Sequence, residues 1–115
     1  MLNIHVEDFG ELVILGCQGR ISNSDAAFAL RDAVTCQTSR LIVIDLSQVD
    51  AIGGGGVGML VFLQRWAQAH DVRLKLFNPS RSLSQRLENH AVIPAFEFAT
   101  VDEITAYLHH GARAA

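Results

Sequence analysis

Five segments of the chain have the hydrophobic pattern of β-strands. In the first segment apolar residues alternate with polar ones, which places Leu2, Ile4 and Val6 on one face of a half-buried strand. The second and third are nearly continuous apolar runs, as expected of central strands covered on both faces. A turn at residues 8–11 joins the first two strands into a predicted hairpin. The predicted strands cover residues 2–6, 12–17, 41–46, 72–77 and 95–98.

Four further segments carry apolar residues at helical spacing. The first begins within residues 22–24, whose side chains can accept hydrogen bonds from the N–H groups of the first helical turn. The third follows Pro79, a residue type suited to the first position of a helix. The fourth begins with Thr100-Val-Asp-Glu103, the pattern of a capping box. The predicted helices end near residues 36, 69, 89 and 110.

In chain order these elements read β-β-α-β-α-β-α-β-α. Strands separated by helices predict parallel pairing with right-handed crossovers, and the opening hairpin adds an antiparallel pair. We therefore expect an α/β fold, a small mixed β-sheet with about four helices packed mainly on one face and around one edge. A chain of 115 residues is long enough for one core. We expect residues 1–110 to form that single domain and residues 111–115 to form a frayed tail.

The composition narrows the class of protein. Half of the residues are apolar and the net charge is −3, so we expect a globular chain that lacks the clustered Lys and Arg needed for nucleic-acid binding. No apolar run approaches the length of a membrane span, and the N-terminal alternation is unlike a signal peptide. Cys17 and Cys36 are too far apart for a CxxC site. We expect both to be reduced thiols buried in the core of a cytoplasmic protein.

The most informative stretch is the turn after the third strand, where four consecutive glycines, Gly53–Gly56, precede the second helix. Glycine allows a helix start to pack closely against strands, and we expect that role for Gly56 and Gly58. Four glycines in a row exceed what packing needs. Each also costs conformational entropy on folding, so the additional glycines call for another explanation. We therefore expect Gly54 and Gly55 to face a partner. The partner's backbone could approach closely there, or its carboxylate could meet the free N–H groups of the helix start.

Apolar residues at the start of the second helix indicate a second part of a docking surface. Val57 and Val61 lie one turn apart on a side of the helix that is otherwise polar. We expect them to form a small exposed stripe beside the glycines, with incidental exposure as the alternative interpretation. Phe28 lies off the apolar face of the first helix and would join this stripe if the two helices are neighbours.

The sequence contains no convincing catalytic or metal-binding motif. Gly53-x-Gly-x-x-Gly58 matches the dinucleotide fingerprint in form, but residues 47–52 separate it from its strand and Asp71 is the one acidic candidate at the expected distance. No Lys-Ser/Thr pair follows the glycines as in a Walker loop. The histidines form no HxxxH or HExxH pair, and no Gly-x-Ser-x-Gly nucleophile elbow is present. We therefore expect a protein without enzymatic activity, metal or cofactor.

The order of elements and several short motifs resemble the STAS domain family, whose best-known members are bacterial anti-sigma factor antagonists. The resemblance extends from about Ile4 to Leu108. It implies a STAS-like fold and a function in binding a regulatory protein. The motifs are Gly19-Arg-Ile-Ser22, Leu41-Ile-Val-Ile-Asp-Leu-Ser47, Val49-Asp-Ala-Ile-Gly-Gly-Gly-Gly-Val-Gly58 and Lys75-Leu-Phe-Asn-Pro79.

One departure from the family pattern bears on regulation. Phosphorylatable members usually carry an Asp-Ser-Ser-Gly turn, and the second serine receives phosphate from a partner kinase. In this sequence Gly53 stands at the aspartate, Gly54 and Gly55 stand at the two serines, and Ser22 stands at a second acidic position of the family. Because glycine has no hydroxyl group, the resemblance implies that there is no phosphorylation site at Gly55.

The resemblance implies a non-enzymatic interaction module in a bacterial partner-switching pathway of transcription regulation. Its partner would be an anti-sigma-factor kinase or a similar regulator, bound without the serine switch. Two alternatives stay open: a sensor that holds a nucleotide or another anion at the glycine turn, and a subunit of a larger signalling assembly, which would make the chain a homo-oligomer. We expect the partner to contact Ser22, Asn23, Ser24, Gly53, Gly54, Gly55, Gly56, Val57 and Val61.

Overall fold

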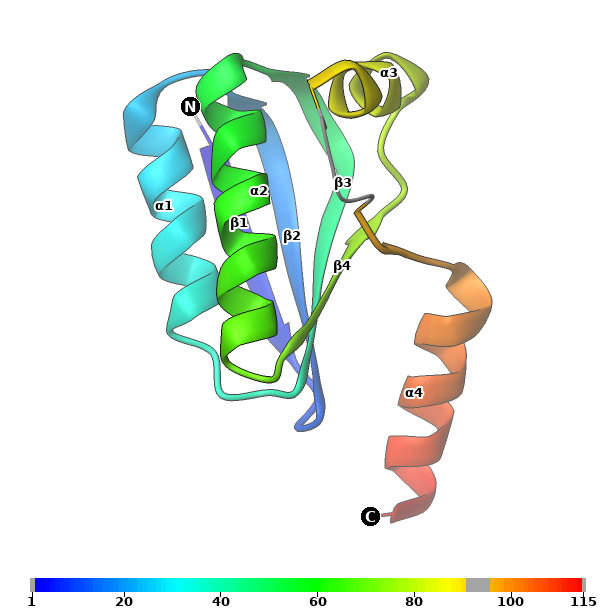
Figure 1. Cartoon of the computed structure of the whole chain (residues 1–115). Coiled ribbons are helices and arrows are strands. Elements are labelled where there is room, and N and C mark those ends of the chain that lie inside the picture. Colours follow the sequence, from blue (N-terminus) through cyan, green and yellow to red (C-terminus); the bar gives the residue numbers. More distant parts are fainter. Residues whose placement is uncertain (1, 91–95, 115) are drawn as a thin grey trace.

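The computed structural model describes residues 2–90 and 96–114, which form a five-stranded mixed sheet and four helices (Figure 1). The order of elements and the fold class predicted from the sequence are confirmed. The strands are β1 (Leu2–Asp8), β2 (Leu12–Ile21), β3 (Leu41–Ile52), β4 (Arg73–Phe77) and β5 (Phe98–Ala99). The helices are α1 (Ser24–Thr35), α2 (Gly54–Ala69), α3 (Arg81–His90) and α4 (Val101–Ala114).

The strands lie in the sheet in the same order as in the sequence, β1-β2-β3-β4-β5. The first pair is antiparallel and the other three are parallel, as the hairpin and the intervening helices predict. The hairpin closes where the Phe9 N–H donates to the Leu12 carbonyl at 2.8 Å. Gly10 lies in this turn at φ +87°, a left-handed conformation that glycine adopts without strain.

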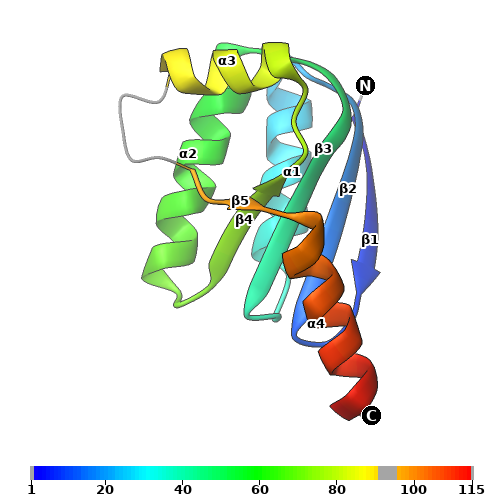
Figure 2. The ribbon, with the colours of Figure 1, turned by 90° about the vertical axis from the view of Figure 1, so that its right-hand side faces the viewer.

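Helices α1 and α2 lie side by side over one face of the sheet (Figures 1 and 2). The main core lies between these two helices and the sheet. There Leu15 of β2 and Ile44 of β3 belong to the same buried cluster as Leu60 and Leu63 of α2, and all four are at most 1% exposed. Burying a side chain of this size stabilises the fold by about 1.5–3 kcal/mol. This layer fixes the position of the α2 start above the carboxyl ends of the parallel strands.

Helix α4 covers part of the opposite face of the sheet (Figure 2), where Ile104 and Leu108 pack on a smaller cluster that includes Leu12 and Val43. Lys75 of β4 lies beneath this helix, 8% exposed, and donates to a Glu103 carboxylate oxygen at 2.5 Å. The hydrogen bond from this ammonium group lowers the pKa of the Glu103 carboxyl below its ordinary value of 4.5.

Of the three helix starts predicted from capping residues, those of α1 and α4 are confirmed and that of α3 is not. Ala26 N–H donates to the Asn23 side chain at 2.8 Å and so caps α1 within the predicted segment. Thr100 and Glu103 exchange the hydrogen bonds of the predicted capping box. The prediction for Pro79 is wrong, since α3 begins at Arg81 and Leu83 N–H donates to the Ser80 hydroxyl oxygen.

Two strand predictions need correction. The predicted third strand ends at residue 46, but residues 47–52 continue β3. The pairing of β3 with β2 shifts register between Gly16 and Gln18 and again between Gly19 and Arg20. These shifts keep Val49 and Ile52 in the core while the residues between them are exposed, so the simple alternation is lost. The last strand is Phe98–Ala99; residue 95 of the predicted strand lies outside the described residues.

The C-terminal ends of α1 and α4 also differ from what the sequence predicts. Cys36 is exposed at the C-terminal end of α1, whereas Cys17 is buried as predicted. Cys36 follows the last turn of the helix and therefore leaves the apolar face that carries Leu30 and Val34 into the core. Helix α4 continues to Ala114. Fraying of residues 111–115 stays a prediction.

Candidate functional site

The glycine turn lies at the end of β3, next to the connection from β2 to α1. The Gly53 N–H donates to the Ile21 carbonyl at 2.9 Å, which ties the turn to the end of β2. The first bond within α2 is from the Val57 N–H to the Gly53 carbonyl at 3.0 Å. The N–H groups of the residues between them have no acceptor within the helix, and Gly53 offers no side-chain cap. The helix start therefore presents backbone donors without its own acidic residue in the first turn.

Gly56 is required by packing, as the sequence predicts. It is buried, and a Cβ atom at this position would lie 2.6 Å from Ile52 Cγ1 and 2.7 Å from the Ile21 carbonyl oxygen. A methyl group cannot be accommodated there unless the end of β2 moves. Gly56 thus lets α2 start directly against the two central strands. The expectation that a partner contacts Gly56 is wrong, because the residue is buried.

Gly54, Gly55 and Gly58 have no such role. All three are exposed, and a Cβ atom at any of them would meet nothing within 4 Å. The packing role predicted for Gly58 is therefore wrong. The expected exposure of Gly54 and Gly55 is confirmed, so the turn opens outward to the solvent.

The docking stripe predicted on α2 is wrong. Val57 is 3% exposed and lies in the main core, and Val61 is partly buried against it. Gln64 belongs to the polar side of the helix on which the two valines were expected to be exposed, but Gln64 is itself only 8% exposed. The buried arc of α2 is wide enough to include this glutamine, so the two valines beside it face the protein.

The exposed apolar residue of α2 is Phe62, at 50% exposure, which sequence reasoning missed. It follows Gly58 by four residues and therefore lies on the same helix face. Phe28 of the neighbouring helix α1 is 47% exposed, as expected, with the Arg31 guanidinium 4.8 Å from its ring centre. A helical wheel centred on the glycines, instead of on the valines, would have found Phe62.

The segment Ser22–Ser24 lies beside the glycine turn. All three residues are exposed, and a Cβ atom on Gly53 would lie 3.7 Å from the backbone of Ser22. The structure therefore brings together two segments that the sequence separates by thirty positions. We call the exposed residues of these segments, together with the exposed Gly58 and Phe62 of α2, the glycine surface: Ser22, Asn23, Ser24, Gly54, Gly55, Gly58 and Phe62.

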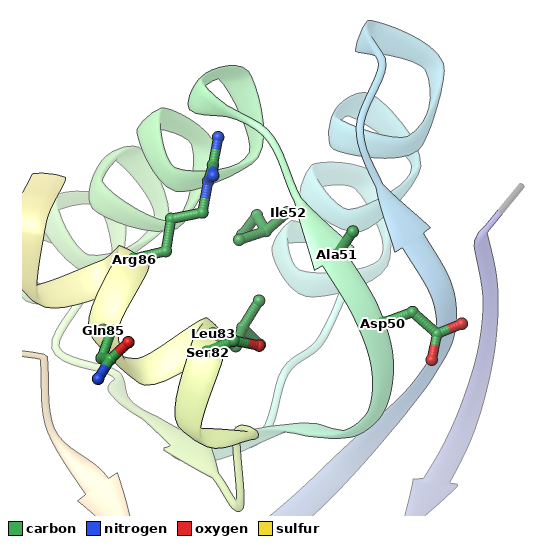
Figure 3. A pocket seen from close by; sticks show the side chains of 7 residues that line it. All are labelled: Asp50, Ala51, Ile52, Ser82, Leu83, Gln85 and Arg86. Atoms are coloured by element: carbon green, nitrogen blue, oxygen red, sulfur yellow. The ribbon is translucent and has the colours of Figure 1, made fainter.

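A shallow pocket of about 330 Å³ adjoins the glycine turn, between the end of β3 and α3 (Figure 3). The Arg86 side chain extends from α3 on the Ile52 side of β3, while the Asp50 carboxylate turns to the other side of the strand (Figure 3). The cationic group of the pocket is thus not neutralised by its acidic neighbour. The lining residues are Asp50, Ala51, Ile52, Ser82, Leu83, Gln85 and Arg86.

Reactive and metal-binding groups do not gather at this surface. Within residues 2–90 and 96–114, no three His, Cys, Asp or Glu side chains are placed to hold a metal ion. Burial, and to a smaller extent the charge of Asp45, raises the pKa of the Cys17 thiol to about 12, so this thiol is not a nucleophile. No helix in the same part of the chain is long and apolar enough to cross a membrane.

A model of the STAS domain matches residues 3–105. The chain belongs to the STAS domain family. The resemblance inferred from the sequence is thereby confirmed. Among curated proteins, none matches the chain.

Solved structures agree with this assignment. The anti-sigma factor antagonist SpoIIAA in its unphosphorylated form is 18% identical, with a TM-score of 0.72 over 94% of this chain and 97% of that chain. An anti-sigma factor antagonist from Mycobacterium paratuberculosis is 17% identical, with a TM-score of 0.71 over 95% of each chain. At these identities the likeness establishes the STAS fold alone.

The solved structure of Mglu contains a similar segment. It is 33% identical with a TM-score of 0.61, over 67% of this chain and 20% of the Mglu chain. This chain therefore spans about a fifth of the Mglu length. The similarity to Mglu thus covers two thirds of this chain and lies within a longer protein.

Proposed function

We propose that this STAS domain is a non-enzymatic interaction module that binds a regulatory protein through the glycine surface. The partner we infer is an anti-sigma-factor kinase or a related regulator, in a bacterial cytoplasmic pathway that controls transcription. The observation that supports this proposal is the outward opening of Gly54, Gly55 and Gly58, which the fold itself does not require. Glycines that weaken a helix without serving its packing are best explained by a molecule that approaches the backbone closely.

The surface has the chemistry of a protein contact. Backbone donors of the α2 start and the hydroxyl groups of Ser22 and Ser24 supply polar contacts at one end. Phe62 supplies an exposed aromatic side chain two turns farther along the helix. Aromatic residues at the centre of an interface commonly carry much of the binding energy, with polar groups around them.

Regulation of this module would differ from that of phosphorylatable family members. Gly55 stands at the position of the serine that receives phosphate, and a glycine cannot be phosphorylated. We infer that the domain binds its partner constitutively, with control exerted by the amount of each protein or by the partner. Incubation with the kinase and ATP should leave the whole chain without phosphate, as read by peptide mass spectrometry. Phosphate on Ser22, Ser24 or Ser47 would contradict constitutive binding and move the regulation to that hydroxyl group.

Calorimetric titration with an anti-sigma-factor kinase from the source organism tests the proposal. Gly55→Gln places a side chain in open space, so the fold should tolerate it while the contact is blocked. Phe62→Ala removes the exposed ring. We expect each variant to weaken binding by at least about fivefold, which corresponds to a loss of more than 1 kcal/mol of binding free energy at an interface residue.

A matched control comes from α4 on the opposite face of the sheet. Ala106 is exposed there, so Ala106→Gln adds the same side chain away from the glycine surface and should leave the affinity unchanged. Equal affinities for the wild type, Gly55→Gln and Phe62→Ala would refute the proposed surface. Failure of every tested kinase to bind the wild type would refute the proposed partner class.

A small-ligand sensor is the second candidate function. It is favoured by the uncapped α2 start together with the neighbouring pocket that contains Arg86, since backbone N–H groups and a guanidinium suit a phosphate or carboxylate. Mglu is also described in an L-glutamate binding form, which makes L-glutamate a useful probe beside ATP, GTP and inorganic phosphate. Binding heat that is lost in Arg86→Gln would support the sensor, and the absence of heat with all four probes would exclude it.

A further inference from the structure

The outer strand β1 forms a long, regular edge of the sheet. It has seven residues and pairs with β2 along its whole length without a register shift. In the part of the chain that the structure describes, no segment lies along its outer side (Figure 2). The opposite edge strand, β5, has two residues. Only the β1 edge therefore offers a strand long enough to pair with another strand.

The hydrogen-bonding groups of this edge can be assigned from the hairpin. The Phe9 N–H donates to Leu12, its partner across the hairpin, and bonded pairs alternate along an antiparallel ladder. Asn3, His5 and Glu7 are then bonded to β2. The N–H and C=O groups of the alternate residues Leu2, Ile4 and Val6 point outward, where β1 has no neighbour.

This edge lacks the features that usually prevent strand addition. Edge strands are commonly protected by proline, lysine or a β-bulge. Residues 2–8 contain no proline and no lysine, and their pairing with β2 is regular. Val6 is 45% exposed although it shares a face with Leu2 and Ile4, which pack against the core. The strand thus presents both unpaired backbone groups and uncovered apolar surface.

We propose that β1 pairs antiparallel with β1 of a second copy of this chain, about a two-fold axis at Ile4. In this register Ile4 faces Ile4 of the second copy, and each Leu2 faces a Val6. These are the residues with outward backbone groups, so each of the three pairs forms two hydrogen bonds. The result is a continuous sheet across both copies, with the helices of both on the same face.

The side chains of β1 favour a second copy of this chain as the pairing partner, and they favour this register. The pairs on the helix side are all apolar, and on the other side Asn3 faces His5, so no like charges meet. The carboxylates of Glu7 and Asp8 lie beyond the residues that pair. A two-fold axis placed at Val6 instead would set Ile4 against Asp8, which buries a carboxylate beside an aliphatic side chain.

The contact is short, so the dimer should be a concentration-dependent one. Five residues of each strand pair. The surface area that they bury is well below the roughly 1,600 Å² of a standard protein–protein interface. The surface is separate from the glycine surface, and the inference does not depend on the proposed function. A dimer would present two glycine surfaces to a partner and so raise its avidity.

Sedimentation velocity from about 10 µM to 1 mM, a range that brackets weak association, tests the proposal on the full chain. The wild type should shift reversibly from monomer to dimer. Val6→Pro removes an outward N–H and leaves the bonds to β2 intact, a position where an edge strand tolerates proline. It should remain monomeric, with an unchanged circular dichroism spectrum.

Two further variants keep the test decisive if Val6→Pro disturbs the fold. Val6→Lys adds a charge at the edge and should also abolish the dimer, whereas Val6→Thr keeps the backbone donor and should retain it. Gly55→Gln should leave the dimer intact. A wild type that stays monomeric at the highest concentration, or a dimer that persists in a folded Val6→Lys variant, would overturn the proposal. Binding of an unrelated strand-forming peptide in place of a second copy would overturn it as well.

Discussion

Single glycine-to-alanine substitutions in α2 separate what the fold needs from what a partner needs. Gly58 lies inside an exposed helix face, and a methyl group there meets nothing within 4 Å. Gly58→Ala should therefore stabilise the protein by about 0.5–1 kcal/mol, because alanine loses less conformational entropy in a helix. For a domain of this size that raises Tm by roughly 2–6 °C.

Gly56→Ala should have the opposite effect. Its methyl group would lie 2.7 Å from the Ile21 carbonyl oxygen and 2.6 Å from Ile52 Cγ1, so the β2 end or the helix start must move. Overpacking of this kind costs about 1–3 kcal/mol. Urea unfolding measured for both variants should show midpoints on opposite sides of the wild-type value, with equal m-values.

The binding side of the same experiment uses the more stable variant. If a partner approaches the glycine backbone closely, Gly58→Ala should weaken kinase binding although it strengthens the fold. A Gly58→Ala variant that is more stable and binds with unchanged affinity would refute the reasoning at this position. A variant that is less stable would contradict the open space around Gly58.

Three further outcomes follow from the burial and charge of particular side chains. Val57→Asp should destabilise the fold by about 3–5 kcal/mol, the cost of an unpaired buried charge. If the variant unfolds at the same temperature as the wild type, Val57 is not buried. A thiol reagent at pH 8 should modify only Cys36 in the native protein and reach Cys17 only after unfolding, because the latter is buried with its pKa raised to about 12. The lowered pKa of Glu103 means that the Lys75 contact contributes stability above pH 4.5 and loses it as the pH falls below that value. Glu103→Gln should therefore be less stable than the wild type at pH 7, with a difference in unfolding free energy that shrinks in acid.

The fold was largely predictable because its elements have strong local signals. The continuous apolar runs that became β2 and β3, the helical spacing in α1 and the capping box at Thr100 each indicate one structure. Their order alone restricts the topology to a mixed sheet with crossover helices. The end of β3 was not predictable, since its register shifts break the alternation that marks a strand.

The candidate site was predictable at its backbone and not at its side chains. Four consecutive glycines identify the turn regardless of tertiary structure. Which face of α2 is exposed depends on how the helix is rotated against the sheet, and a wide buried arc hides Gln64 together with Val57. The contact of Ser22 with Gly53 joins segments distant in sequence, and only the parallel pairing of β2 with β3 brings it about.

Hydrogen–deuterium exchange of the protein with and without its kinase partner tests the central claim most directly. Gly54 and Gly55 are exposed and their N–H groups have no acceptor within α2, so these groups should exchange rapidly in the free protein. A partner seated on the glycine surface should slow exchange in peptides that contain residues 53–58 and 22–24. Protection confined to other parts of the chain, with the glycine turn exchanging as fast in the complex as alone, would contradict the account.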